Sequence, residues 1–118
     1  MSKHNQKIGG WGEEIAAVYL QEKGYQLVNR NVRTPYGEID LIVRRDEITV
    51  FVEVKTRTSA RYGYPEESIN ARKQEHMFAA AEYYSQEKAL EHWQIDAVSV
   101  EGKPSGVKPK ITHFEDVL

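Results

Sequence analysis

The sequence predicts an α/β fold in which helices flank a central mixed β-sheet. Two segments carry apolar residues at helical spacing, and five segments show the composition and turn borders of strands. Their order along the chain is helix, three strands, helix, two strands. The chain has 118 residues, which suits one hydrophobic core, so we expect residues 1–118 to form a single domain.

The first helix is expected over residues 10–23, because its apolar side chains follow helical spacing: Ile15, Ala16, Val18, Tyr19 and Leu20. Gly24 follows directly and is the usual residue for a left-handed C-terminal cap. The first strand is then expected over residues 25–32. A turn at residues 34–37 follows, since this segment contains both Pro and Gly.

The two strongest strand segments are residues 37–44 and 48–57. Only three residues separate them, which leaves room for a tight hairpin turn. The second helix is expected over residues 70–86, with Asn70 as its N-cap. Residues 93–100 and 107–114 complete the predicted sheet as a second hairpin around a Gly- and Pro-containing turn.

Composition excludes several classes of chemistry. The chain has no cysteine, which removes disulfides, thiolate nucleophiles and cysteine-ligated zinc or iron–sulfur sites. Its net charge of −2 does not by itself indicate a nucleic-acid-binding protein. No apolar run suits a membrane span or a signal peptide, so we expect a cytoplasmic protein without membrane contact. The histidines show no metal-ligand spacing, and we expect surface or structural roles for His4, His76, His92 and His113.

Residue alternation in the long hairpin brings two acidic residues together. Its apolar residues are expected to share one face: Ile39, Leu41, Val43, Ile48, Val50, Val52 and Val54. A two-residue turn at Asp46 and Glu47 then places Asp40 directly opposite Glu53 on the other face. Like charges in that position repel, which a divalent cation would relieve. Carboxylate oxygens suit Mg²⁺ or Mn²⁺, so we expect one of these metals here.

Lys55 is expected beside this pair, because it lies two residues beyond Glu53 on the same face, about 6–7 Å along the strand. Its ammonium group is placed to contact a phosphate or a metal-bound water. The alternative is an ordinary cluster of salt bridges on a solvated face. Phe51 and Ile42 share the face and favour partial burial of the cluster.

These residues carry a resemblance to a known family. Residues 37–42 (Gly-Glu-Ile-Asp-Leu-Ile) and 51–57 (Phe-Val-Glu-Val-Lys-Thr-Arg) resemble the Asp…Glu-x-Lys core of the PD-(D/E)XK nuclease superfamily. The chain is most similar to the YraN-like family of bacterial predicted endonucleases, which resembles archaeal Holliday junction resolvases. The resemblance implies a restriction-endonuclease-like sandwich of two or three layers with a central mixed β-sheet. Ile39 stands where the superfamily's name has proline.

The resemblance also implies further site residues. Glu13 matches the family's third acidic residue better than Glu14, although both could simply be acids at a helix start. The backbone carbonyl of Val54 often completes the metal shell in such sites. Gln74 corresponds to a helical Gln that helps to orient the site in some of these nucleases, with a solvated helix face as the alternative. Asp96 also matches the family, but it could instead cap or pair within the sheet.

Basic residues suggest a DNA-contacting rim next to the acidic pair. The segment from Lys55 to Lys73 is rich in them, with Tyr62 and Tyr64 interleaved, and its predicted DNA contacts are Arg57, Arg61, Arg72 and Lys73. An ordinary mixed-charge loop is the alternative.

The sequence therefore predicts a divalent-metal-dependent endonuclease that hydrolyses DNA phosphodiester bonds. The predicted catalytic residues are Glu13, Asp40, Glu53, Lys55 and Gln74. A branched-DNA substrate and a homodimer are implied by the resemblance alone. The second hypothesis is a non-catalytic nucleic-acid-binding or scaffolding module that keeps the nuclease fold.

Overall fold

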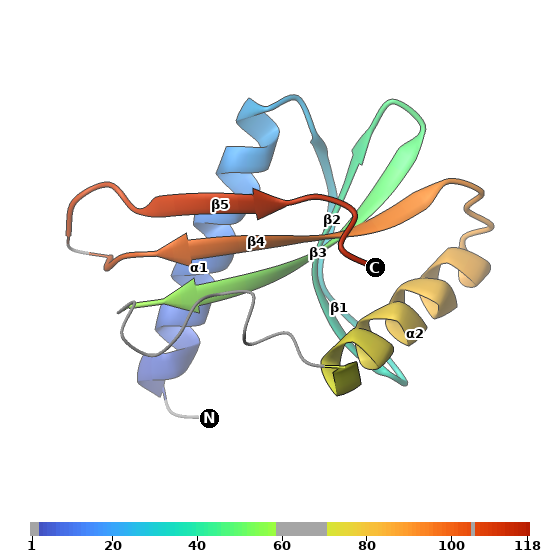
Figure 1. Cartoon of the computed structure of the whole chain (residues 1–118), viewed down its shortest axis with the longest axis horizontal. Coiled ribbons are helices and arrows are strands. Elements are labelled where there is room, and N and C mark those ends of the chain that lie inside the picture. Colours follow the sequence, from blue (N-terminus) through green and yellow to red (C-terminus); the bar gives the residue numbers. More distant parts are fainter. Residues whose placement is uncertain (1–2, 59–70, 105) are drawn as a thin grey trace.

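A five-stranded mixed sheet with two helices forms the described part of the chain (Figure 1). The computed structural model describes residues 3–58, 71–104 and 106–118. The elements are α1 (Lys3–Glu22), β1 (Gln26–Thr34), β2 (Gly37–Arg45), β3 (Ile48–Arg57), α2 (Ala71–Glu87), β4 (Trp93–Glu101) and β5 (Lys110–Phe114). The described strands lie in sequence order; among them the β3–β4 pair is parallel and the other neighbouring pairs are antiparallel. The predicted α/β class with a mixed sheet is therefore confirmed.

The element boundaries differ from the prediction mainly at two places. Helix α1 begins at Lys3 rather than at residue 10, because the paired glycines at positions 9 and 10 weaken a helix without ending it. Strand β5 begins at Lys110 rather than at residue 107, and Pro109, which directly precedes it, has no N–H to donate to the ladder. Asn70, the predicted N-cap of α2, lies outside the described residues.

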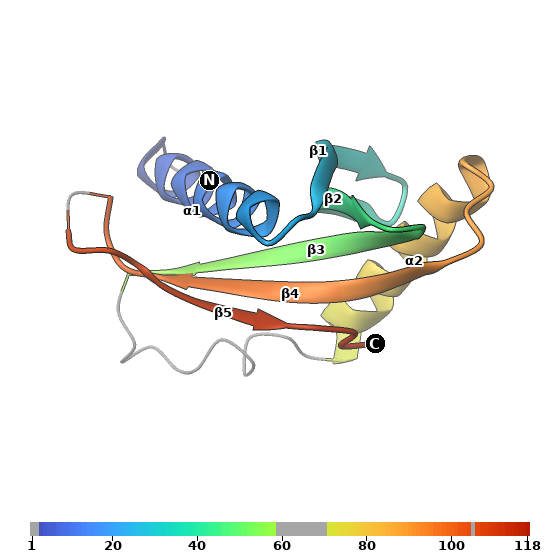
Figure 2. The ribbon, with the colours of Figure 1, turned by 90° about the horizontal axis from the view of Figure 1, so that it is seen from above.

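The helices cover opposite faces of the sheet, so the sandwich has three layers. Helix α1 lies along one face (Figure 2) and buries Ala16, Ala17 and Leu20 against Leu41, Val43, Val50, Val52, Val98 and Val100. Helix α2 buries Ala80 and Ala81 against the other face, on Ile39, Ile42, Phe51 and Ile95. Because successive strand residues point to opposite faces, β3 supplies apolar side chains to both layers. None of the described helices has the length and apolar character to cross a membrane.

Two residues depart from the predicted apolar face of the long hairpin. Leu41, Val43, Val50 and Val52 share the α1 face as expected. Ile39 instead packs with the α2 cluster, and it lies beyond the last β2–β3 pair. Ile48 begins β3 next to the turn, and 41% of it is exposed.

Candidate active site

Strands β2 and β3 separate at the predicted acidic pair. The predicted register is present, since Leu41 pairs with Val52, which is the last pair of the described ladder. Asp40 and Glu53 are the next residues on the two strands. Beyond Leu41 the contact between the strands is made by the Asp40 side chain, whose Oδ2 accepts a hydrogen bond from the N–H of Val54 at 2.8 Å. Asp40 is thus held at the point where the hairpin opens.

The surroundings of Asp40 disfavour a negative charge. Burial raises the pKa of its carboxyl, the neighbouring Glu53 raises it further, and the hydrogen bond from Val54 lowers it by less, so that the pKa reaches about 7. The charge of Glu13 acts in the same direction as that of Glu53. Without a cation, the site therefore holds a proton on Asp40 during much of the time near neutral pH. A cation bound beside Asp40 would stabilise its ionised carboxylate.

Lys55 supplies part of that charge. Its Nζ lies 2.9 Å from Glu53 Oε1, and both side chains are more than four-fifths buried. Burial lowers the pKa of Lys55, but the hydrogen bond and charge of Glu53 outweigh it, so that the pKa lies above its ordinary value. Lys55 is therefore a cation held beside the acidic pair, and Glu53 orients its ammonium group.

Helix α1 brings Glu13 to the same end of the hairpin. Gly12 packs against Thr56 of β3 so closely that a Cβ at position 12 would overlap the threonine side chain. Burial raises the pKa of Glu13, while a hydrogen bond from the Asn31 amide, at 3.0 Å in its hydrogen-bonding orientation, lowers it. Glu53 also raises this pKa, which places the two carboxylates within electrostatic reach.

Glu14 points elsewhere. It forms an ion pair with Arg30 at 2.8 Å on the surface, where 59% of its side chain is exposed. Of the two candidates for the third acidic residue of the site, Glu13 is thus the one next to Asp40 and Glu53. Its role as a metal ligand stays a prediction.

The other predicted site residues lie at different distances from this group. Lys73, in the first turn of α2, is close enough to Lys55 to have its pKa lowered by that neighbour. Gln74 follows it and is half-buried, whereas Arg72 is exposed.

Val54 contacts Asp40 through its N–H, and the predicted role of its carbonyl stays untested. Arg57 ends β3. Arg61, Tyr62 and Tyr64 lie outside the described residues.

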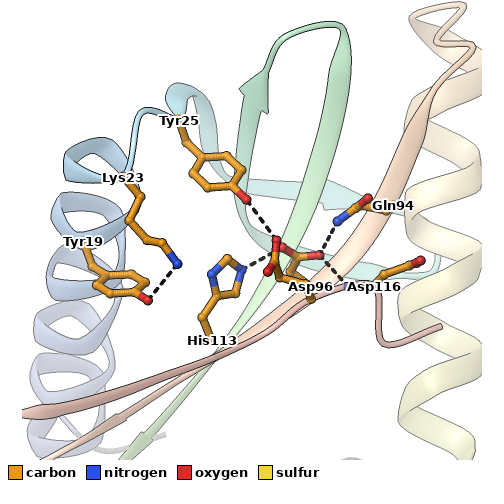
Figure 3. Close-up of polar contacts among 8 residues, drawn as sticks. Tyr19, Lys23, Tyr25, Gln94, Asp96, His113 and Asp116 are labelled. Carbon is orange, nitrogen blue, oxygen red and sulfur yellow. Dashed lines mark hydrogen bonds and ion pairs between the residues drawn. The ribbon is translucent and has the colours of Figure 1, made fainter.

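A second polar cluster lies between β4 and β5, on the α1 face (Figure 3). Asp96 is fully buried and accepts hydrogen bonds from His113 Nε2 at 2.7 Å, the N–H of Asp116 at 2.9 Å and Gln94 Nε2 at 2.9 Å. Burial raises the pKa of Asp96, but these hydrogen bonds outweigh it and hold the pKa below its usual range. The second predicted alternative, an Asp96 that pairs within the sheet, matches these contacts.

Asp96, His113 and Glu115 together could hold a metal ion, because their ligand atoms all lie within 4.8 Å of one another. Among the residues that the structure describes, Glu13, Asp40 and Glu53 do not form so tight a group. Sequence spacing missed the cluster because Asp96 is on β4, whereas His113 is on β5 and Glu115 lies just after β5. The available signal was the second hairpin, whose pairing sets His113 opposite Val98, two residues from Asp96.

Comparison with other proteins identifies the family. The model of the uncharacterised protein family UPF0102 matches residues 12–100, three quarters of the chain. The chain belongs to the UPF0102 family. This is the YraN-like family that the motifs predicted, so the resemblance is confirmed. The matched residues include Glu13, Asp40, Glu53, Lys55 and Asp96, whereas His113 and Glu115 lie beyond them.

Relatives align over nearly the whole chain. A UPF0102 protein of Syntrophotalea carbinolica is 39% identical over 116 residues, which cover 97% of this chain and 93% of the relative. A UPF0102 protein of Syntrophomonas wolfei is 44% identical over 112 residues, or 93% and 96% of the two chains. One from Dehalococcoides mccartyi is 43% identical over 103 residues, or 86% and 85%.

Proposed function

We propose that this UPF0102 protein is a divalent-metal-dependent endonuclease that hydrolyses DNA phosphodiester bonds. The observation that carries the proposal is Asp40, a carboxylate buried where two strands part, whose pKa is raised to about 7 by burial and by Glu53. A fold has little reason to retain such a destabilised charge for structure alone. Perturbed titratable groups that converge in this way are typical of active sites.

The donors present suit Mg²⁺ or Mn²⁺. Asp40 and Glu53 would hold the ion, with Glu13 and the Val54 carbonyl as further oxygen donors. Bound there, such an ion lowers the pKa of a water ligand and stabilises negative charge on a phosphate. The hydrogen bond from Val54 uses one oxygen of Asp40 and fixes the orientation of the carboxylate.

The remaining side chains act on the phosphodiester. Lys55 is a cation at pH 7, and its ammonium donates to a phosphate oxygen or to the attacking water. Glu53 holds that ammonium at 2.9 Å, so Lys55 is oriented before DNA arrives. Because negative charge grows on the phosphate in the transition state, a preoriented cation accelerates hydrolysis more than it strengthens binding. Arg57, Arg61, Arg72 and Lys73 are proposed to line the DNA path around this centre, and Gln74 is proposed to help orient it.

Cleavage of four DNA forms tests the proposal: single-stranded, duplex, flap and four-way-junction DNA, each with Mg²⁺ and with Mn²⁺. The branched substrate implied by the resemblance predicts faster cleavage of the flap or junction. The matched pair Glu13→Gln and Glu14→Gln changes one charge on adjacent residues of α1, and only the first should slow cleavage. DNA binding without cleavage of any form would favour the non-catalytic module instead. The proposed homodimer is tested in parallel by sedimentation.

A further inference from the structure

A basic hollow lies at the end of the sheet beyond the candidate active site. It has a volume of about 400 Å³ and is formed where β3 ends and where β4 turns into β5. Its lining includes four cations and one carboxylate: Arg57, Lys103, Lys108, Lys110 and Glu101. The whole chain has a net charge of −2, so this end of the molecule differs in sign from the average surface.

Strand pairing assembles the hollow from distant parts of the chain. Arg57 is the partner of Glu101, and Glu101 is the partner of Lys110, which makes one row across three strands. The N–H of Gly102 donates to the carbonyl of Arg57 at 2.9 Å and extends the contact past the ladder. Lysines from the β4–β5 turn therefore lie beside the end of β3.

This row is continuous with the active-site face. Glu53, Lys55 and Arg57 alternate along β3, so all three point to the same face of the sheet. Lys55 lies about 6–7 Å before Arg57 along the strand. Cations at Lys55, Arg57 and Lys110 thus extend from the proposed phosphate contact toward β5, with Glu101 between Arg57 and Lys110.

The cations of the hollow are available to a ligand. Over residues 3–58, 71–104 and 106–118, none of the four has a charged nitrogen within 4.0 Å of a carboxylate oxygen. Lys108 and Lys110 are also exposed. Several separate cations along one surface fit a polymer of phosphates better than a single small anion, because each can meet a different phosphate.

We propose that this hollow binds the phosphodiester backbone of DNA and extends the DNA path from Lys55 across the β4–β5 turn. The choice of DNA as the ligand rests on the proposed function. The contacts are electrostatic and carry no base recognition, so they position the DNA without selecting its sequence.

Binding of a fluorescent DNA duplex in EDTA across a salt series tests the inference without cleavage. The variant Lys108→Gln/Lys110→Gln should weaken binding and reduce the slope of log K against log salt by about 2. The control Lys23→Gln/Lys88→Gln removes the same charge from exposed lysines elsewhere and should bind as the wild type does. Lys103→Gln, in the turn, serves as a second variant if substitution within β5 perturbs folding.

The outcomes separate this inference from the proposed function. If the wild type cuts DNA and the Lys108→Gln/Lys110→Gln variant binds like the control, the inference is wrong and the nuclease stands. If the wild type cuts nothing but this variant loses affinity and slope, the hollow binds DNA and the nuclease proposal is wrong. A wild type that binds no duplex in EDTA overturns the inference.

Discussion

At the scale of single residues, Asp40 links folding to the proposed chemistry. Its carboxyl has a pKa of about 7 in the folded chain and 3.8 as an isolated group. Between these values the folded state binds more protons than the unfolded state, so the free energy of unfolding falls as pH rises. The negative charge of Asp40, which the proposed metal would bind, therefore lowers the stability of the metal-free protein.

Asp40→Asn tests this linkage. The amide oxygen can still accept from Val54, but the residue no longer ionises. Without metal, wild-type stability should decline between about pH 4 and pH 7 by up to about 1.4 kcal/mol per pH unit from this group. The Asn variant should lack this component and match or exceed the wild-type melting temperature at pH 8. Urea unfolding across pH in EDTA measures it.

The surface variant Asp46→Asn is the control, because it removes an exposed acid at the hairpin turn and should keep the wild-type slope. Added Mn²⁺ should raise the melting temperature of the wild type and of Asp46→Asn. An equal Mn²⁺ response in Asp40→Asn would contradict the metal assignment.

Lys55→Ala separates chemistry from binding. The residue is proposed to contact phosphate and to provide no metal ligand. The variant should bind DNA within about tenfold of the wild type. Its cleavage should fall by about a hundredfold or more, because Lys55 acts on charge that develops in the transition state. Single-turnover rates with saturating protein measure the chemical step. Lys88→Ala is the control, and equal loss of binding and rate would assign Lys55 to binding alone.

At the scale of elements, the contact of α1 with β3 positions the third acid. Gly12 leaves no room for a Cβ against Thr56, so the helix lies as close to the strand as its backbone allows. Glu13 follows directly and reaches the electrostatic field of Glu53 and Asp40. A small residue therefore helps to set where the side chain of Glu13, a proposed metal ligand, lies.

Gly12→Ala should push α1 away from β3. The overlap should destabilise the fold by about 1–3 kcal/mol, as overpacking does, and should reduce metal binding because Glu13 moves with the helix. Gly10→Ala has open space around its Cβ and should be neutral or stabilise by up to about 1 kcal/mol. Chemical denaturation compares the two. Thr56→Ala in the Gly12→Ala background should restore part of the loss, and no recovery would place the strain elsewhere.

At the scale of the whole molecule, strand pairing brings β4 and β5 into contact with the first helix. The parallel β3–β4 pair and the antiparallel β4–β5 pair set Asp96 beside His113 beneath α1. Tyr19 and Tyr25 pack edge-on against the His113 ring. The cluster thereby ties β4 and β5 to the first helix.

Asp96→Ala should destabilise the protein strongly. Removing the carboxylate leaves the buried His113 and the N–H of Asp116 without their acceptor, at about 1–3 kcal/mol for each group left without a partner. Because the folded pKa of Asp96 is lowered, its contribution exists above pH 3.8 and is lost as pH falls further. Glu115→Gln, an exposed neighbour, should have a small effect. Equal losses in urea unfolding would contradict a structural role for Asp96.

Much of the fold and the acidic pair followed from local patterns. Strand alternation and a two-residue turn predicted the register around Leu41 and Val52, because the side-chain period of a strand leaves few ways to bury both apolar rows. The motif around Asp40, Glu53 and Lys55 is local to one hairpin. Its members could therefore be brought together from the sequence alone.

Tertiary structure decided what depends on contacts between distant segments. The sequence favoured Glu13 over Glu14 as the third acidic residue, and the contacts that separate the two are tertiary: Gly12 lies close against Thr56, and Glu14 pairs with Arg30. The Asp96–His113 pair and the basic hollow at Lys103, Lys108 and Lys110 arise only when β5 pairs with β4. The sequence predicted this second hairpin, but the register that makes these residues neighbours was decided by the folded sheet.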